Sequence, residues 1–200
     1  MLLWVCGGGV LLIVYDKDTL FYTINSTVLP LLNVIMPFIT YLGEGWLIVV
    51  TLLTLLGFNR FRNWWYFTAA VLSNVLPSIF TQIIKSSVQA PRPLKYFNEL
   101  QWVHTLPDWP RLMERSFPSG HTCGAFSLFC FLSLLLPERQ RYYGLFFFFL
   151  ALMVGYSRIY LAAHFFEDVY VGSIIGSLVS ILTVSIMNKY THLFFASKAT

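Results

Sequence analysis

Polar residues of the kinds that bind and transfer phosphate occur in three short patches between residues 85 and 168. The patches are Lys85 with Arg92-Pro93, then Pro118-Ser119-Gly120-His121, then Ser157-Arg158 with His164 and Asp168. They supply three fixed cations, two imidazoles, one carboxylate and a glycine turn whose backbone N–H groups can face an anion. Phosphoryl transfer depends mainly on positioned charges and hydrogen-bond donors. The residues therefore predict a site that moves a phosphoryl group without a metal ion.

The two arginines and the lysine are suited to holding phosphate oxygens. The planar guanidinium groups of Arg92 and Arg158 can bind two oxygens at once, whereas Lys85 acts as a point charge. An ordinary alternative for Lys85 and Arg92 is that their side chains extend from helix ends to reach water at a membrane surface. The phosphate-binding interpretation is favoured because Pro93 follows Arg92 and because the other two patches contain residues suited to the same chemistry.

Ser119, Gly120 and His121 stand where a helix is predicted to begin. The free N–H groups and the dipole at a helix start attract anions, and Gly120 lets the backbone approach closely. Ser119 can add a hydroxyl donor. A plain Ser or Gly helix start is the simpler interpretation, but it does not account for the histidine that follows at the membrane boundary.

His164 and Asp168 are four residues apart, so they share one face if the link between them is helical. A carboxylate bonded to one ring nitrogen fixes the tautomer and leaves the other nitrogen free as a nucleophile. The alternative is a His–Asp pair that caps the following helix. The nearby Ser157-Arg158 is unnecessary for a cap, so catalysis is favoured.

The remainder of the chain is strongly apolar. Its 200 residues are 57% hydrophobic and 11% charged, with a mean hydropathy of +0.68, which is far from a soluble composition. The net charge of +4 does not indicate nucleic acid binding, because the basic residues fall in small groups without a basic run. Cys6, Cys123 and Cys130 lie in apolar stretches without metal-ligand spacing, which favours buried inert thiols.

Charged residues taken as boundaries predict one all-α domain, a polytopic membrane helix bundle with six transmembrane helices. The predicted spans are residues 2–15, 41–58, 64–84, 121–136, 143–161 and 168–187. The first is short enough to be the core of a signal peptide, but it lacks a basic start and an obvious cleavage site. Residues 19–40 contain two prolines and two asparagines, so an interfacial segment is expected there.

The basic residues between the spans predict the orientation of the bundle. They cluster at one face, as Arg60, Arg62, Arg139, Arg141, Lys189 and Lys198. The positive-inside rule assigns this face to the cytoplasm, which places all three patches at the opposite face. We therefore expect a multi-pass membrane protein whose site lies on the outer face and whose termini are both cytoplasmic. Its partner is the lipid bilayer, and no obligatory protein partner is evident.

The connector at residues 94–117 is expected to form a loop on the outer face, beside the site. It is rich in aromatic residues and contains Lys95, Arg111 and Arg115, which are candidate head-group contacts. A simple interfacial lid is an equally good interpretation. Glu44 could face the same cavity, but an acid at a membrane boundary is weak evidence for function. His104 has no partner at a useful spacing.

The three patches resemble the signature of a known family. K-x6-R-P, P-S-G-H and S-R-x5-H-x3-D, in this order, are similar to the motifs of the type 2 phosphatidic acid phosphatase (PAP2) superfamily, and the span pattern resembles its six-span bacterial lipid phosphatases. Each motif alone is weak, whereas the ordered set is specific. No motif position departs from the family pattern.

The resemblance implies a helical core like that of vanadium haloperoxidases and a role for each residue. His164 would attack phosphorus to form a phosphohistidine while Asp168 orients it, and His121 would protonate the leaving oxygen and then help to activate water. The phosphate oxygens would be held by Lys85, Arg92, Ser119, Gly120 and Arg158. The family uses no metal or other cofactor.

The resemblance implies a bacterial inner membrane with a periplasmic site, and it leaves the lipid open. The candidates are undecaprenyl pyrophosphate, phosphatidylglycerophosphate, phosphatidic acid or diacylglycerol pyrophosphate, and lipid A phosphates, with pyrophosphates cut at the terminal phosphate. A lipid phosphotransferase would use the same intermediate. A haloperoxidase is disfavoured by the predicted spans, and a non-catalytic lipid-phosphate binder or transporter is the alternative from another class.

Overall fold

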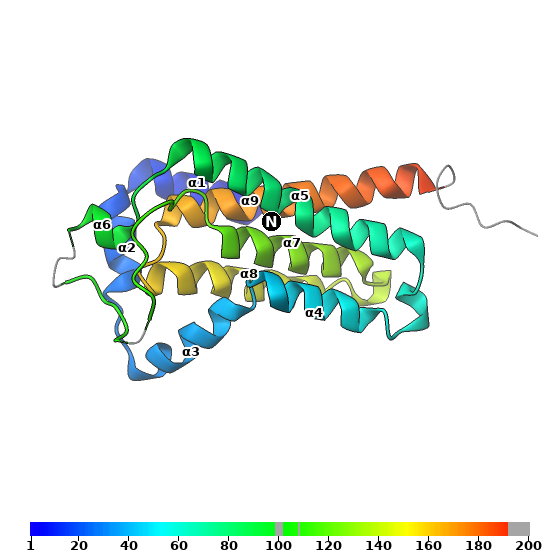
Figure 1. The fold of residues 1–200 in the computed structure, drawn as a ribbon, viewed down its shortest axis with the longest axis horizontal. Coiled ribbons are helices and arrows are strands. Elements are labelled where there is room, and N and C mark those ends of the chain that lie inside the picture. Colours follow the sequence, from blue (N-terminus) through cyan, green and yellow to red (C-terminus); the bar gives the residue numbers. More distant parts are fainter. Residues whose placement is uncertain (99–101, 108, 192–200) are drawn as a thin grey trace, which may run out of the picture.

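The described part of the protein is helical throughout. The computed structural model describes residues 1–98, 102–107 and 109–191, and within these ranges it contains helices and no strand (Figure 1). The α-helices are α1 (Leu2–Val14), α2 (Lys17–Asn25), α3 (Pro30–Tyr41), α4 (Gly45–Leu55), α5 (Trp64–Val88), α6 (Pro93–Tyr96), α7 (Gly120–Leu135), α8 (Tyr143–Tyr160) and α9 (Phe166–Lys189). Two short 3-10 turns, η1 (Asn59–Phe61) and η2 (Glu138–Gln140), join long helices.

Helix α7 lies at the centre of the bundle and packs against α5, α8 and α9. Its closest approach is to α9, where Gly172 and Gly176 face the α7 backbone. A Cβ atom on Gly176 would lie 2.3 Å from the Cys123 carbonyl oxygen, and one on Gly172 would lie 2.6 Å from that of Ser119. Small residues four apart allow two helices to pack this closely inside a membrane. The contact fixes the starts of α7 and α9 side by side.

Polar side chains fix the starts of the helices that carry the patches. The Asn63 side chain accepts a hydrogen bond from Tyr66 N at the start of α5, and Ser119 Oγ accepts one from Thr122 N at the start of α7. Such caps satisfy N–H groups that have no partner within the helix. The starts of α5 and α7 therefore fall close to the expected residues 64 and 121. Helix α8 begins at the expected residue 143 without a side-chain cap, and α9 begins two residues before 168.

The predicted count of six spans is not confirmed. Within the described residues, three helical stretches are long and apolar enough to cross a bilayer: Trp64–Tyr96, Tyr143–Tyr160 and Phe166–Lys189. The pair α2 and α3 adds a fourth if it counts as one broken span, and it is bent by 112°. Helices α1, α4 and α7 are apolar but have only 13, 11 and 16 residues, whereas a straight crossing needs about 20.

One expected segment differs from the structure, whereas α1 (Leu2–Val14) nearly coincides with the expected residues 2–15. Residues 41–44 of the segment 41–58 end α3 and form a turn, because glycines at 43 and 45 interrupt the helix around Glu44. Helix α1 begins beside the middle of α9, where Ser177 Oγ lies 3.7 Å from Met1 Sδ and Trp4 Nε1 donates to Ser173 Oγ at 2.8 Å. It therefore runs along only part of α9.

The two ends of the bundle differ in character. Turns η1 and η2 and the end of α9 carry Arg60, Arg62, Arg139, Arg141 and Lys189, at the right of Figure 1. The end of α5, the starts of α7 and α9 and the end of α8 meet at the other end of the bundle, with α6 and the connector. Lys198 lies outside the described residues. Antiparallel connection of the helices thus brings the three patches to one end.

Candidate active site

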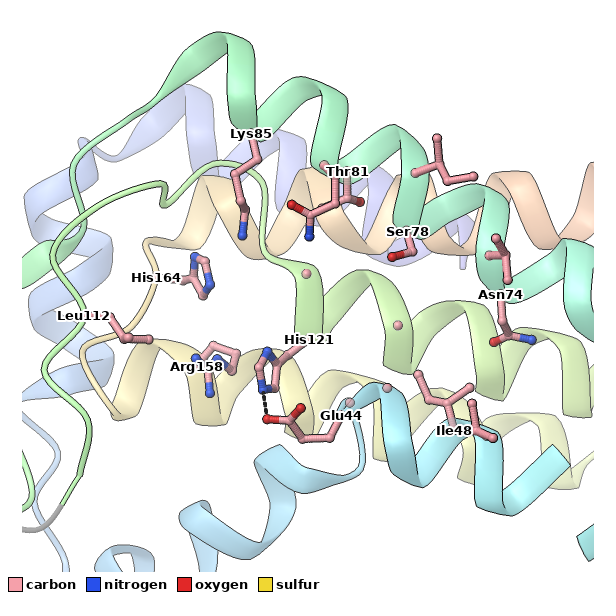
Figure 2. Close-up of a pocket in the computed structure, with 18 of the residues that line it drawn as sticks. Glu44, Ile48, Asn74, Ser78, Thr81, Lys85, Leu112, His121, Arg158 and His164 are labelled. Carbon is pink, nitrogen blue, oxygen red and sulfur yellow. Dashed lines mark hydrogen bonds and ion pairs between the residues drawn. The ribbon is translucent and has the colours of Figure 1, made fainter. Parts of the chain in front are cut away.

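One cavity of about 500 Å³ receives side chains from all three patches (Figure 2). Its polar lining is contributed by the α5 end, the segment after α5, the start of α7, the end of α8 and the α8–α9 link, as Lys85, Arg92, Gly120, His121, Arg158 and His164. Glu44 and Leu112 complete this end of the cavity. The structure therefore brings together residues that are up to 120 positions apart in the chain (Glu44 to His164).

His164 and Asp168 form a buried pair next to the cavity. His164 Nδ1 lies 3.2 Å from Asp168 Oδ2, and both side chains are 1% exposed. The same carboxylate oxygen accepts hydrogen bonds from Phe165 N at 2.9 Å and from Ser116 Oγ. Because a carboxylate accepts, Nδ1 carries the proton and Nε2 presents its lone pair. This is the tautomer that a histidine nucleophile requires.

Cations on the cavity side keep His164 neutral. Burial, followed by the charges of Arg92, Arg158 and Lys85, lowers the pKa of His164 well below its ordinary value. Removal from water and neighbouring positive charges both disfavour the imidazolium. Nε2 therefore remains available as a nucleophile at neutral pH.

Arg92 is held by hydrogen bonds to the backbone around His164. Its Nε donates to Glu114 O at 2.7 Å and its Nη1 donates to Ala163 O at 3.0 Å. Nη1 also lies 3.3 Å from His164 Nε2. The guanidinium is thus rigidly positioned at the reactive nitrogen, where a phosphate oxygen would have to lie during attack.

Arg158 is almost fully buried, with 3% of its surface exposed. Its Nη1 donates to Thr40 Oγ1 at 2.8 Å, whereas its Nε has no hydrogen-bond partner among the described residues. A buried N–H group without a partner is costly and rare. An anion in the adjacent cavity would satisfy this guanidinium, as expected for a phosphate-binding arginine.

Ser119 and Gly120 differ in how they meet the cavity. Ser119 is buried, caps α7 and accepts a hydrogen bond from Thr122 Oγ1 at 2.9 Å, while its N–H donates to Asp168 O at 3.0 Å. It is absent from the described lining of the cavity, whereas Gly120 is part of it. A Cβ on Gly120 would lie 4.0 Å from Lys85 Nζ. A direct phosphate contact by Ser119 or Gly120 stays a prediction.

His121 contacts a partner, Glu44, that was not predicted from the sequence. His121 Nε2 lies 2.7 Å from Glu44 Oε1, and these two side chains are 27% and 36% exposed (Figure 2). Glu44 is 77 residues away in the chain, and its only signal was an acid near a membrane boundary. Thr40 and Ser116, which hold Arg158 and Asp168, carried no such signal.

The connector meets the cavity through an apolar residue. Leu112 belongs to the lining, whereas Lys95, Arg111 and Arg115 are not among the described lining residues. Lys95 forms an ion pair with Glu114. The assignment of these three residues to head-group recognition remains a prediction. His104 is bonded to the helices beside the connector, since its Nε2 lies 2.9 Å from Asn33 Oδ1.

Sequence comparison places these residues inside a known family profile. The PAP2 superfamily matches residues 62–192, a range that contains all three patches. An undecaprenyl-diphosphatase of Sulfolobus acidocaldarius is 28% identical over 167 residues, which cover 84% of this chain and 76% of the relative.

Two solved structures have a similar fold. Aquifex aeolicus LpxE has a TM-score of 0.73 and 30% identity, over 86% of this chain and 97% of that one. The first transmembrane PAP2-type phosphatidylglycerolphosphate phosphatase from Bacillus subtilis has a TM-score of 0.70 and 20% identity, over 100% of this chain and 96% of that one. The helical core is therefore that of these membrane proteins.

Proposed function

The chain belongs to the PAP2 superfamily, and we propose that it is an integral membrane lipid phosphatase. It hydrolyses a phosphate monoester, or the terminal phosphate of a pyrophosphate, on a membrane lipid. The single observation that carries this proposal is the cavity in which His164, held by Asp168, faces Lys85, Arg92 and Arg158. A nucleophile beside three cations suits phosphorus carried on an anionic group.

The reaction runs in two displacements through a phosphohistidine. His164 Nε2 attacks phosphorus, the bond from phosphorus to the leaving oxygen breaks, and protonated His121 gives that oxygen a proton. Neutral His121 then takes a proton from water as the water oxygen attacks phosphorus. The P–N bond breaks, inorganic phosphate leaves and His164 recovers its lone pair. The three cations hold the nonbridging oxygens in both steps.

A groove between α4 and α5 suits the lipid tail. Beyond the cations and histidines, the cavity is lined by residues of these two helices that alternate in character: Ile48, Val49, Val75 and Ile79 are apolar, whereas Asn74, Ser78, Thr81 and Gln82 are polar. A second, apolar hollow of about 250 Å³ shares Ile48, Val49, Asn74 and Val75 with it and continues along α4 and α5. A substrate with its phosphate among the cations can therefore lay its chain against the same pair of helices.

The orientation follows from the contrast between the two ends of the bundle. We assign the end with Arg60, Arg62, Arg139 and Arg141 to the cytoplasm, because short basic loops remain on that side. The site then opens to the periplasmic face of a bacterial inner membrane. Six crossings require the short helices α1, α4 and α7 to count as spans in a locally thinned bilayer. The position of Met1 beside Ser177 gives no support for a cytoplasmic N-terminus.

Phosphate release by the purified protein tests the function. The panel comprises undecaprenyl pyrophosphate, phosphatidylglycerophosphate, phosphatidic acid, diacylglycerol pyrophosphate and lipid A, each with EDTA present. We expect inorganic phosphate from at least one lipid, and release from none would overturn the proposal. Labelled phosphate on a second lipid would instead identify a phosphotransferase. Full function of a His164→Ala variant would identify a binder or transporter.

A further inference from the structure

The turn between α3 and α4 is built against the first turn of α7. A Cβ atom on Gly43 would lie 2.4 Å from the His121 carbonyl oxygen, and one on Gly124 would lie 3.1 Å from the carbonyl oxygen of Gly43. Glycine at both positions therefore lets the two backbones approach closely. The close approach brings the next residue, Glu44, against the His121 ring (Figure 2).

Glu44 makes this contact in place of a bond to its own helix. It occupies the residue position immediately before α4, where Ser, Thr, Asp and Asn side chains commonly accept a hydrogen bond from a backbone N–H of the first turn. Its side chain makes no such bond. Instead, its carboxylate meets His121 Nε2 at 2.7 Å. The Glu44 carboxylate is therefore placed to contact His121 and not to cap α4.

A carboxylate in this cavity also opposes the binding of an anion. The charged and titratable groups facing His121 are Lys85 from α5, Arg158 from α8 and, across the cavity, Arg92 and His164. Glu44 is the single acid among the described lining residues. Placing a negative charge where a phosphate binds is unfavourable unless that charge serves a neighbouring group.

We propose that Glu44 is a positioning residue for His121, an inference that rests on the proposed phosphatase function. By accepting a hydrogen bond from Nε2–H, its carboxylate leaves Nδ1 as the ring nitrogen that serves the leaving oxygen. Its charge also stabilises the imidazolium that the first step requires.

The proton transfers balance with Glu44 ionised throughout. In the first step the Nδ1 proton of the imidazolium moves to the leaving oxygen. In the second step neutral Nδ1 accepts a proton from the attacking water, which restores the imidazolium. Glu44 keeps Nε2 protonated in both states, so the same ring nitrogen delivers and receives the proton.

Glu44→Gln is the sharpest variant, because it keeps the size and the acceptor oxygen but removes the charge. We expect kcat to fall about 10- to 100-fold, a part of what a general acid contributes. The alkaline limb of the kcat profile should move to lower pH. KM should not rise, because the substitution removes a negative charge from a cavity that binds an anion.

Glu44→Asp should recover part of the rate. Glu138→Gln, a carboxylate at the opposite end that pairs with Arg141, is the matched control and should leave all values unchanged.

A double variant separates this role from a general structural one. In a His121→Asn background, Glu44→Gln should cause no further loss, because residues that act as a unit are not additive. A loss of kcat in the double variant equal to the product of the two single losses would overturn the proposal. So would wild-type kcat and an unchanged pH profile in Glu44→Gln, while the lipid phosphatase function itself would stand.

Nitrogen-15 NMR of labelled histidine in the detergent-solubilised protein gives a readout that needs no substrate. The His121 signal, identified by its loss in His121→Asn, should be that of the Nε2–H tautomer, and Glu44→Gln should weaken this preference. An Nδ1–H tautomer in the wild type would refute the inference. If the wild type released no phosphate from any lipid, the proposed function would fail independently of this result.

Discussion

Two histidine–carboxylate pairs share one cavity, but they are built differently. His164 and Asp168 are four residues apart and 1% exposed, and the carboxylate also holds Phe165 N and Ser116 Oγ. His121 and Glu44 are 77 residues apart and about one-third exposed, and a single contact joins their side chains.

The difference teaches how one site can separate two chemical tasks. A nucleophile needs one fixed tautomer and exclusion of water, which several hydrogen bonds and full burial supply. A group that gives and takes a proton must exchange it with water between turnovers, which partial exposure allows. The buried pair is thus suited to attack, and the open pair to proton transfer.

Removal of His164, the proposed nucleophile, should have the largest effect on activity. We expect His164→Ala to lower lipid phosphate release by about 10⁴-fold or more, since loss of a covalent nucleophile has effects of this order. Lipid binding should persist, because the three cations remain. Phosphate release and binding to substrate-containing vesicles measure the two quantities. Residual turnover within about tenfold of the wild type would exclude His164 as nucleophile.

Substitution of Asp168, the carboxylate of the buried pair, should cause the second-largest loss of activity. Asp168→Asn permits the wrong tautomer of His164, so we expect a loss of about 10² to 10⁴-fold in kcat. The neighbouring acid is a matched control, because Glu167 pairs with Lys17 at 2.6 Å. Glu167→Gln should stay within about threefold of the wild type. Equal losses in the two variants would indicate a shared structural effect.

The third prediction concerns the pH dependence of activity, whose acidic limb is assigned to His164 of the buried pair. Because burial and cations lower the pKa of His164, activity should persist below pH ~6.5, the ordinary histidine value, and decline only as His164 becomes protonated. Arg92→Gln removes one of these cations, which raises the pKa of His164. The acidic limb of kcat/KM should therefore move to higher pH. A limb that stays in place or moves to lower pH would contradict the assigned role of Arg92.

The smallest expected effect concerns a support of the buried pair. Ser116→Ala removes a hydrogen bond to Asp168, and bonds to charged groups contribute about 1.5 to 3 kcal/mol. We expect kcat to fall roughly tenfold or somewhat more. Circular dichroism should show that the helical content is unchanged. Ser87→Ala, an exposed serine of α5 that bonds Ile83 O, should have no effect. An unchanged rate in Ser116→Ala would show that Asp168 is held sufficiently without it.

Local signals made much of the fold predictable. Asn63 and Ser119 mark helix starts because their side chains cap free N–H groups. The turn at residues 41–44 was not predictable to the same degree. A long apolar segment specifies burial but not where the chain bends, and the turn depends on how Gly43 packs against α7.

The sequence by itself indicated the family and the proposed chemistry, because three ordered patches contain the proposed nucleophile, its carboxylate, the second histidine and the cations. It also indicated that the ends of α5 and α8 and the starts of α7 and α9 would lie near one another, since antiparallel helices alternate in direction. Only the tertiary structure decided that Glu44 meets His121 and that α4 and α5 form a groove from the site. These contacts join distant segments through close packing, and no local pattern of residues encodes which surfaces will meet.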